Sequence, residues 1–236
     1  MTNNASRYWA VVPAAGVGTR MQADRPKQYL SLAGRTVIEH SLDRLLNHSA
    51  IAGGVLALSV GDPYWPDLGY RHAKPLWIAA GGSERSASVL SALQLLSTRA
   101  DDGDWVLVHD AARPCLRATD MDRLIERCTA HPVGGLLAVP VRDTLKRADT
   151  CGQVVTTVDR GNLWHAQTPQ MFRLGDLRHA LRDALAAGIT ITDEASALEW
   201  AGRAPLLVEG HADNLKITRP EDLALAAFHL VGDADS

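Results

Sequence analysis

A glycine-containing loop close to the N-terminus is the part of the sequence best suited to chemistry on a phosphate group. An apolar run predicts a buried strand that ends at Pro13, and small residues follow it. Gly16 and Gly18 let the loop bring backbone N–H groups close to a ligand, and such donors bind phosphate oxygens. Arg20 and Lys27 come next in the sequence. The stretch therefore predicts a phosphate-sized concavity with two cations beside it.

Two common phosphate-binding patterns are absent from this loop. The dinucleotide fingerprint G-x-G-x-x-G requires a third glycine or alanine where this chain has Met21. The other phosphate loop requires Gly-Lys-Ser/Thr after four intervening residues, and the sequence lacks it here. A strand-to-helix turn that uses glycine only for its geometry has the same spacing. The loop alone leaves the turn and the nucleotide site equally open.

A carboxylate at the end of a later apolar run is the second candidate. Asp110 stands in His-Asp-Ala-Ala-Arg-Pro, at the end of an expected strand. Ligands of open α/β sheets bind at the carboxyl ends of the strands. Mg²⁺ takes one or two carboxylates together with substrate phosphates, so Asp110 fits a magnesium ligand. A surface ion pair with Arg113 is the simpler alternative, and we expect His109 to be a hydrogen-bonded structural residue and not a general base.

Two further candidates are a double-glycine segment before an expected helix and a lysine late in the chain, Lys216. Gly81-Gly82-Ser83-Glu84-Arg85 follows an expected strand and opens a helix, so it presents free N–H groups at the helix N-terminus. Ser88 lies one turn beyond Glu84 and suits a base or ribose contact, although capping by Ser83 is the simpler explanation of the segment alone. Lys216 alternates with two apolar neighbours and therefore points away from their face.

Thr192 and Thr218 each stand at the start of an expected helix. N-capping accounts adequately for the segment Thr192-Asp193-Glu194-Ala195. Thr218 has Glu221 three residues further on, which is the spacing of a capping box. On the sequence pattern alone, both threonines therefore have a structural explanation.

Most of the chain alternates strand-like apolar runs with helical patterns. Strands are expected at 8–12, 54–60, 76–80, 105–109, 135–141 and 206–208, and helices at 37–46, 84–96, 121–128, 174–187, 194–201 and 221–230. This alternation predicts an α/β fold with a doubly wound, mostly parallel sheet. No internal repeat, low-complexity tract or linker divides the chain, so residues 1–236 are expected to form a single domain.

The pattern changes between residues 142 and 170, where polar residues and a turn at Gly152 predict a β-rich excursion. One subunit alone would bury such an arm poorly. We therefore expect a projecting β-arm whose exposed edge pairs with a second chain, so that the arm forms a homodimer. Thr144 and Arg160 lie in this arm, and taken alone they are merely polar strand residues. Trp164 is expected to be a packing residue.

Composition and charge indicate the class of protein. The 236 residues, 46% of them hydrophobic and 22% charged, suit one large globular domain. A formal net charge of −3 argues against nucleic acid as a partner. The three cysteines lack paired spacing, and no signal peptide or membrane-spanning run is apparent. These features predict a soluble cytoplasmic protein with reduced thiols and no membrane contact.

Pro-Ala-Ala-Gly-x-Gly-x-Arg-Met, from Pro13 to Met21, and the following Pro26-Lys27-Gln28 resemble the start of the nucleotidyltransferases that activate small phosphorylated compounds with CTP. Within this group, the sequence is most similar to the 2-C-methyl-D-erythritol 4-phosphate cytidylyltransferase family of the non-mevalonate isoprenoid pathway. The resemblance runs from about Trp9 to Leu230 and includes VPVRDTLKRA, LWHAQTPQMF and ITDEASALE. It implies a Rossmann-like nucleotidyltransferase fold and the transfer of CMP from CTP to 2-C-methyl-D-erythritol 4-phosphate, with release of pyrophosphate.

The resemblance also implies roles for individual residues. Arg20 and Lys27 would stabilise the pentavalent transition state at the α-phosphate. Arg160 and Lys216 would position the acceptor phosphate, with Arg160 reaching from the arm into the partner's site. Asp110 would help to bind Mg²⁺ and a substrate hydroxyl. The substrate-binding residues implied in this way are Pro13, Ala14, Ala15, Gly16, Gly18, Gly81, Gly82, Ser88, Asp110, Ala111, Arg113, Thr144, Thr192 and Thr218.

Other families and activities share parts of this sequence pattern. A relative that transfers CMP to ribitol 5-phosphate shares the loop, the His-Asp-x-x-Arg-Pro segment and the late lysine. A sugar-phosphate nucleotidyltransferase that uses another nucleoside triphosphate is less similar. A regulatory module that only binds nucleotide would not need Arg20 and Lys27 at the transferring phosphate. A Rossmann oxidoreductase is disfavoured by Met21 and by the lack of an obvious ribose-binding acid after the second strand.

Overall fold

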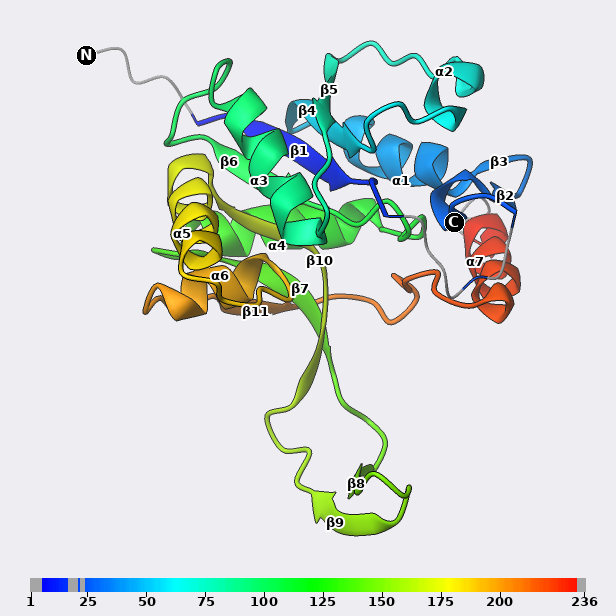
Figure 1. Ribbon diagram of the computed structural model, residues 1–236, viewed down its shortest axis with the longest axis vertical. Coiled ribbons are helices and arrows are strands. Elements are labelled where there is room, and N and C mark those ends of the chain that lie inside the picture. The colour runs from blue at the N-terminus through cyan, green and yellow to red at the C-terminus, as the bar shows by residue number, and fades with distance from the viewer. Residues whose placement is uncertain (1–5, 17–20, 22–23, 233–236) are drawn as a thin grey trace.

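The centre of the fold is a seven-stranded sheet with the order β11-β7-β10-β6-β1-β4-β5. The computed structural model describes residues 6–16, 21 and 24–232 (Figure 1). The strands of this sheet are β1 (Tyr8–Pro13), β4 (Ile51–Leu58), β5 (Leu76–Ala80), β6 (Trp105–Val108), β7 (Gly134–Pro140), β10 (Trp164–Arg173) and β11 (Leu206–Glu209). All run in the same direction except β10, which is antiparallel to its neighbours β6 and β7. The expected α/β, doubly wound and mostly parallel sheet is therefore confirmed.

Helices connect the strands, and those expected from the sequence begin within one residue of the predicted start, except that the helix expected at 121–128 begins three residues earlier and the helix at 64–68 was not predicted. They are α1 (Val37–Leu46), α2 (Tyr64–Leu68), α3 (Arg85–Leu96), α4 (Ala118–Thr129), α5 (Leu174–Ala186), α6 (Glu194–Trp200) and α7 (Pro220–Gly232), with a 3₁₀ turn, η2, at Lys27–Tyr29. A capping box starts α1, because the Glu39 carboxylate accepts from the backbone N–H of Thr36 at 2.8 Å. Within residues 6–16, 21 and 24–232, no helix is long and apolar enough to span a membrane.

Strand β10 is the strand of the central sheet that the sequence pattern did not predict, since residues 164–170 were expected to belong to the arm. Its second half lies deep in the sheet, where Gln170 pairs with Val108 of β6 and with Leu136 of β7. Polar residues such as Gln167 and Gln170 interrupt its apolar pattern, although both are buried. Their amides bond to other segments of the chain, Gln167 to the carbonyl oxygen of His211 and Gln170 to residues at the start of α6.

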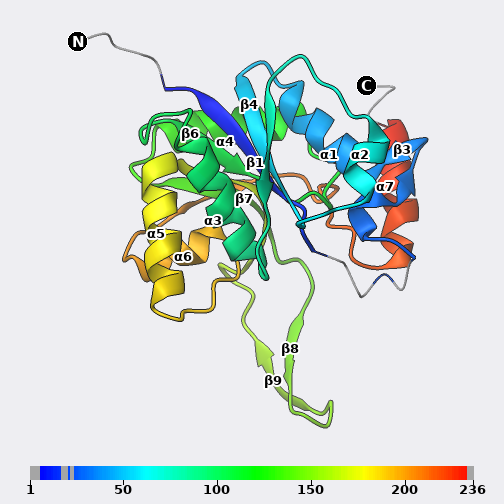
Figure 2. The same ribbon diagram turned by 45° about the horizontal axis from the view of Figure 1, so that its top comes forward.

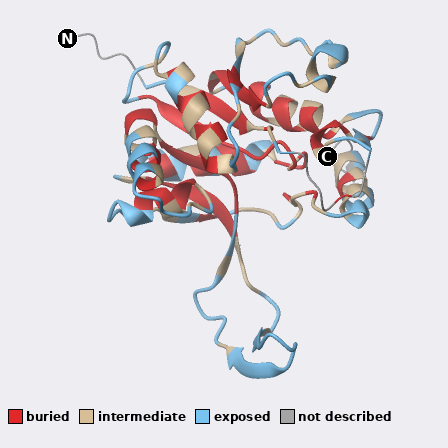
Figure 3. Cartoon of the chain, viewed as in Figure 1, coloured by how far each residue is buried: buried red, intermediate tan, exposed pale blue. Residues whose placement is uncertain are grey.

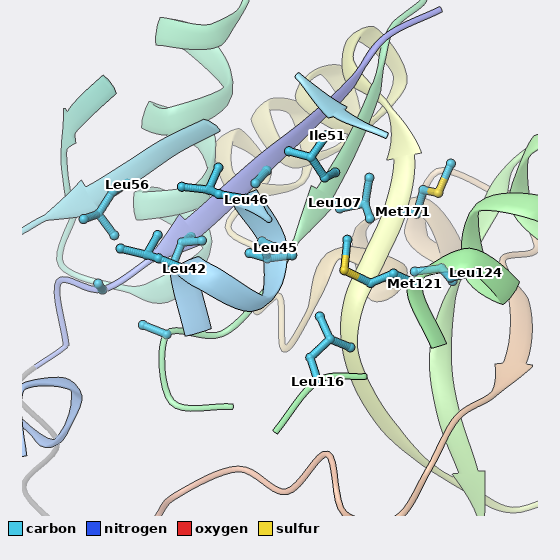
Figure 4. Close-up of a cluster of buried hydrophobic side chains, with 14 of the residues drawn as sticks. Leu42, Leu45, Leu46, Ile51, Leu56, Leu107, Leu116, Met121, Leu124 and Met171 are labelled. Atoms are coloured by element: carbon cyan, nitrogen blue, oxygen red, sulfur yellow. The ribbon is translucent and has the colours of Figure 1, made fainter. Parts of the chain in front are cut away.

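Two layers of apolar side chains cover the two faces of the sheet. On one face, Leu42, Leu45 and Leu46 of α1 pack in one cluster with Met121 and Leu124 of α4 (Figure 4). On the other face, α3, α5 and α6 contribute a second cluster. Strand β1 serves both layers because its successive side chains alternate between the two clusters. Figure 3 shows the resulting buried centre, which fixes where the parallel strands end.

A hairpin between β7 and β10 projects from the body in both Figure 1 and Figure 2. It contains the antiparallel strands β8 (Leu145–Ala148) and β9 (Val154–Val158). A further two-stranded sheet, β2 (Ser31–Leu32) with β3 (Arg35–Thr36), lies beside α7. The hairpin is exposed in Figure 3, and even the apolar residues Val154 and Val155 are 63% and 62% exposed. Its strands therefore gain almost no burial within this chain.

Candidate active site

A pocket of about 290 Å³ lies beyond the carboxyl ends of β1, β5 and β6. This is where the order of the sheet reverses, because β1 is followed by β4 on one side and later by β6 on the other. The pocket is lined by Pro13, Ala14, Ala15, Gly16, Lys27, Gln28, Gly82, Ser83, Glu84, Arg85, Ser88, Asp110, Ala111, Ala112 and Lys216. It thus brings together residues from the first loop, the double-glycine segment, the Asp110 segment and the late lysine.

The loop after β1 is held from behind by a buried glutamine. Gln28 is only 4% exposed, and its Nε2 donates to the carbonyl oxygens of Ala14 at 2.8 Å and Gly16 at 3.1 Å. The hydroxyl of Ser59 donates to the carbonyl oxygen of Ala15 at 2.8 Å. These bonds engage the loop carbonyls in the protein and favour a loop that offers N–H groups to an anion. Gln28 was not predicted as a site residue, although it belongs to the quoted Pro-Lys-Gln motif.

Two lysines that are distant in the sequence meet at one wall of the pocket. The Nζ of Lys27 donates to the carbonyl oxygen of Ile217 at 2.7 Å, and Ile217 is the neighbour of Lys216. The segment that carries Lys216 is itself anchored by the N–H of Ile217, which donates to Ala112 at 2.8 Å. Gly18 and Arg20, predicted for the same site, lie outside the described residues. The structure therefore places one of the two predicted transition-state cations.

Asp110 is surrounded by positive side chains. Its Oδ1 accepts from Arg85 Nε at 2.8 Å, its Oδ2 pairs with Lys216 Nζ at 2.7 Å, and Arg113 Nε lies 3.8 Å from Oδ2. Burial alone would raise the pKa of Asp110, but Arg85 and Lys216 hold this pKa well below its usual range. The carboxylate is therefore ionised near neutral pH. The alternative of a surface ion pair with Arg113 is met only in part, because this pair is largely buried and is the longest of the three contacts.

Arg85 and Glu194 were not predicted as site residues, yet they form the tightest ion pair beside the pocket. Arg85 Nη1 lies 2.6 Å from Glu194 Oε1, and Nη2 lies 3.1 Å from Oε2. Burial alone would lower the pKa of Arg85, but Glu194 and Asp110 raise it above the ordinary value. A double-glycine segment that opens a helix was the available signal for Arg85. Nothing local to the sequence pairs it with Glu194, which is 109 positions away.

His109 is a structural residue, as the sequence analysis predicted. It is fully buried, with Nε2 3.0 Å from the carbonyl oxygen of Arg113 and Nδ1 2.9 Å from the hydroxyl of Thr168. Burial lowers the pKa of His109 to about 4. The imidazole is therefore neutral near pH 7, and both of its nitrogens are engaged inside the protein.

The double-glycine segment faces the loop after β1 across a very short distance. A Cβ built on Gly81 would lie 2.3 Å from Ala15 Cβ, so only glycine fits there. The hydroxyl of Ser88 accepts from the N–H of Gly82 at 3.0 Å and donates to Glu84 at 3.0 Å. The alternative explanation, a cap by Ser83, is wrong, because Glu84 is the residue before α3 and makes no side-chain cap. Ser88 lines the pocket while it ties this segment to its own helix.

Several predicted residues lie apart from this pocket. Thr144 and Arg160 are exposed on the hairpin, where the Arg160 guanidinium donates to the carbonyl oxygen of Arg142. Thr192 is exposed just before α6, whose N-cap is Asp193, as the capping explanation predicted. Within one chain, the arm residues and Thr192 therefore line no part of the pocket around Asp110.

The capping box predicted for Thr218 and Glu221 is wrong. The carboxylate that accepts is that of Asp222, from the N–H groups of Thr218 at 2.7 Å and Arg219 at 2.8 Å. The helix begins at Pro220, which is one residue before the expected range 221–230 and one residue after the start that a Thr218 cap would give, and the absent N–H of proline costs nothing there. The Thr218 hydroxyl instead donates to the carbonyl oxygen of Lys216 at 3.1 Å, and thereby supports the turn that carries this lysine.

Comparisons with known proteins agree with this arrangement. Residues 8–231 match the family model described as IspD: 2-C-methyl-D-erythritol 4-phosphate cytidylyltransferase. The protein of that name from Pseudomonas putida (strain GB-1) is 59% identical over 224 residues, which cover 94% of this chain and 95% of the relative. The one from Pseudomonas aeruginosa (strain UCBPP-PA14) is 62% identical over 223 residues, with the same coverage of both chains.

Solved structures extend the likeness to the fold. The crystal structure of the Francisella tularensis protein of the same name is 37% identical, with a TM-score of 0.80 over 95% of this chain and 100% of that chain. A crystal structure of a 4-diphosphocytidyl-2C-methyl-D-erythritol synthase is 40% identical, with a TM-score of 0.83 over 95% and 99% of the two chains. The chain belongs to the 2-C-methyl-D-erythritol 4-phosphate cytidylyltransferase (IspD) family.

Proposed function

We propose that the pocket around Asp110 and Lys216 is the site at which this chain transfers CMP from CTP to 2-C-methyl-D-erythritol 4-phosphate. Membership of the family makes the chain a CTP-dependent cytidylyltransferase of isoprenoid synthesis. The product is 4-diphosphocytidyl-2-C-methyl-D-erythritol, and pyrophosphate leaves. The observation that carries the location is the convergence of Arg85, Arg113 and Lys216 on one buried carboxylate, beside a loop suited to phosphate.

The reaction requires no general base from the protein. A phosphate monoester has a second pKa near ~6, so the attacking oxygen of the acceptor is largely deprotonated at neutral pH. This oxygen forms a bond to the α-phosphorus while the bond from that phosphorus to the bridging oxygen of pyrophosphate breaks. The main obstacle is the repulsion between anions, which placed cations and backbone donors reduce. The buried, fully bonded His109 supports this view, since it has no free nitrogen for proton transfer.

We assign the cations to the two ends of the reaction. Lys27 and Arg20 would stabilise the α-phosphate in the transition state, and Lys216 would position the acceptor phosphate. The position of Lys27 beside the glycine loop supports the first assignment, and the 38% exposure of the Lys216 side chain at the pocket supports the second. Lys27→Ala should lower kcat by ~10²–10³-fold, as is typical of such electrostatic groups. Near-normal turnover of this variant would exclude the role.

The residues around Asp110 fit a magnesium ion that shares its ligands with the substrate. Within the described part of the chain, no group of three or more His, Cys, Asp or Glu side chains could hold a metal ion. Asp110 would supply one carboxylate oxygen, and phosphate oxygens and water would complete the shell. When bound, the ion would neutralise charge on the triphosphate. We expect activity to stop with EDTA and to return with Mg²⁺, and persistence in EDTA would contradict the proposal.

The arm would complete the site of a second copy of the chain. We propose that the chain is a single nucleotidyltransferase domain that forms a homodimer through residues 142–170, with Thr144 and Arg160 acting in the partner's pocket. The exposure of Val154 and Val155 supports this use of the arm. Arg160→Ala and Lys216→Ala chains should each be inactive alone and regain activity when mixed and reassembled. The mixed dimer contains one pocket with both residues, so a mixture that stays inactive would contradict the arrangement.

The cysteines bear on the compartment in which the chain works. We propose that the chain works in the reducing cytoplasm, where its substrates are free small molecules and it has no nucleic acid or membrane partner. Cys115, Cys128 and Cys151 form no disulfide bond, and Cys115 and Cys128 are buried. Burial raises the pKa of Cys128 to about 12, so this thiol is unreactive. Recovery of the activity in a membrane or secreted fraction would contradict this assignment.

The experiment that tests the function is pyrophosphate release from CTP and Mg²⁺ in parallel with two acceptors. We expect release with 2-C-methyl-D-erythritol 4-phosphate and none with ribitol 5-phosphate. Release with ribitol 5-phosphate alone would keep the mechanism but change the substrate. Silence with both acceptors, despite CTP binding, would contradict the transferase function.

A further inference from the structure

A buried carboxylate beside the pocket has no part in the reaction as described above. Glu194 is 1% exposed and stands at the first turn of α6, on the opposite side of Arg85 from Asp110. Buried carboxylates are costly unless they are paired and hydrogen-bonded. Arg85 satisfies both oxygens of Glu194 with two separate nitrogens, and this two-point contact fixes the orientation of the guanidinium plane.

The position of Glu194 is itself set by the main sheet. The amide of Gln170, on β10, donates to Asp193 Oδ2 at 2.9 Å and accepts from the N–H of Ala195 at 2.8 Å. Gln170 therefore holds the residues on both sides of Glu194. Since Gln170 is 1% exposed, this anchor has little freedom to move. The chain of contacts runs from β10 through Glu194 and Arg85 to Asp110.

The pairing decides which oxygen of Asp110 each cation reaches. Arg85 uses its two terminal nitrogens on Glu194, so Nε remains for Asp110 Oδ1 at 2.8 Å. The other oxygen, Oδ2, is then left mainly to Lys216 at 2.7 Å, with Arg113 Nε more distant at 3.8 Å, on the side where the acceptor phosphate is proposed to bind. Without the charge of Glu194, Arg85 would have only Asp110 as a carboxylate partner and could turn its fork onto both oxygens.

We propose that Glu194 is a positioning residue for cytidylyl transfer: it holds Arg85 so that only Nε engages Asp110 Oδ1, and it thereby leaves Oδ2 oriented toward Lys216 and the reacting phosphates. The inference rests on the proposed role of Asp110 in the reaction. Glu194 acts through Arg85 and touches neither substrate. It also links the start of α3, which lines the pocket, to the start of α6.

Glu194→Gln tests the proposal because it keeps the shape of the side chain and removes its charge. Partners that orient a ligating group typically change activity by about 10–100-fold, and we expect a loss of kcat of that size. The matched control is Asp104→Asn. Asp104 is also buried and accepts from Trp9 Nε1 at 3.0 Å and from the N–H of Arg7 at 2.9 Å, but it lies outside the pocket.

Both variants should lower the melting temperature, whereas only Glu194→Gln should lower kcat at a temperature at which each variant is folded. An equal kcat in the two variants would overturn the proposal and leave Glu194 a merely structural residue. Should Glu194→Gln fail to fold, Glu194→Asp keeps the charge, withdraws the carboxylate from Arg85 and is expected to lower kcat in the same way. Wild-type kcat in a folded Glu194→Asp enzyme would likewise overturn it.

A double-mutant comparison shows whether Glu194 acts through Asp110. In an Asp110→Asn background, Glu194→Gln should cause little further loss of kcat, because the oxygen that it orients is already changed. A full additional 10–100-fold loss would contradict the proposal. Wild-type kcat in Asp110→Asn alone would instead remove the role proposed for Asp110. The two failures are therefore distinguishable.

Discussion

Gly81 provides the sharpest test of how the nucleotide loop is positioned. It follows β5 and faces Ala15 of the loop after β1. In Gly81→Ala, the new Cβ would lie 2.3 Å from Ala15 Cβ and 3.0 Å from the carbonyl oxygen of Leu58. Carbon atoms in contact prefer a separation of about 3.5–4.0 Å, so the two segments would have to separate by more than about 1 Å. The N–H of Gly81 donates to Leu58 at 2.6 Å, and this bond opposes the movement.

The cost of this substitution is that of overpacking a tight contact. Such changes destabilise proteins by about 1–3 kcal/mol. In a chain of this length each kcal/mol lowers Tm by about 2–4 °C, so we expect Tm to fall by about 2–12 °C. Because Ala15 lines the pocket, its displacement should also raise KM for CTP. The two effects share one cause, and therefore they should appear together.

Two other glycines serve as controls in the same assays, which are thermal unfolding and pyrophosphate release at varied CTP. A Cβ on Gly103 meets nothing within 4 Å, so Gly103→Ala should change neither Tm nor KM. A Cβ on Gly16 also meets nothing within 4 Å, but Gly16 lines the pocket, so Gly16→Ala should raise KM with little change in Tm. A Gly81→Ala protein with the Tm and KM of the wild type would refute the argument for close approach.

Three further predictions concern single side chains. Burial holds the pKa of His109 at about 4, below its value near 6.5 in the unfolded chain, so the neutral imidazole contributes its full stability above about pH 6.5. This contribution is lost as the pH falls toward 4, by up to about 1.4 kcal/mol per pH unit. The free energy of unfolding in urea should therefore be lower at pH 5 than at pH 7, and His109→Gln should reduce this difference. Gln28→Glu places a carboxylate against two loop carbonyls and should raise KM for CTP by about tenfold, whereas an unchanged KM would exclude the loop-holding role of Gln28. Asp222→Ala should lower the free energy of unfolding by about 1 kcal/mol, whereas Glu221→Ala should leave it unchanged. A larger loss in Glu221→Ala than in Asp222→Ala would instead support the capping box of Thr218 and Glu221.

The sequence predicts best those features that depend on local pattern. Helix α1 has the bounds expected from its apolar spacing because a capping box and a buried face act together at Val37–Leu46. The carboxyl ends of β1 and β6 bring Gly16 and Asp110 into one pocket because parallel strands end on the same edge of the sheet. These features follow from periodicity and from one topological rule.

The features that sequence reasoning missed depend on contacts between distant segments. Strand β10 lies antiparallel between β6 and β7. Its buried polar residues bond to other segments of the chain and not to solvent, so the sequence lacks the apolar pattern of a buried strand there. Arg85 and Glu194 pair across 109 positions, and neither residue type nor spacing indicates such a pair. A Thr218 cap would start the helix at Arg219, but α7 starts at Pro220, and the carboxylate of Asp222 accepts from the N–H groups in place of Glu221. The first two features depend on tertiary contacts, whereas the third depends on the exact start of a helix.

The place at which the arm leaves the body has a further consequence for the chain. Its two ends belong to β7 and β10, which are hydrogen-bonded neighbours in the central sheet, with Trp164 opposite Pro140. The sheet itself therefore holds together the ends of this excursion. Closure entropy grows only slowly with the length of a loop, so residues added or removed beyond this pair alter the stability of the body little. The arm leaves from the carboxyl end of β7, the same edge of the sheet at which β1 and β6 open onto the pocket. A change of length between Pro140 and Trp164 is therefore expected to leave the body folded but to displace Thr144 and Arg160, so that stability and the proposed contribution to a second pocket can be altered independently.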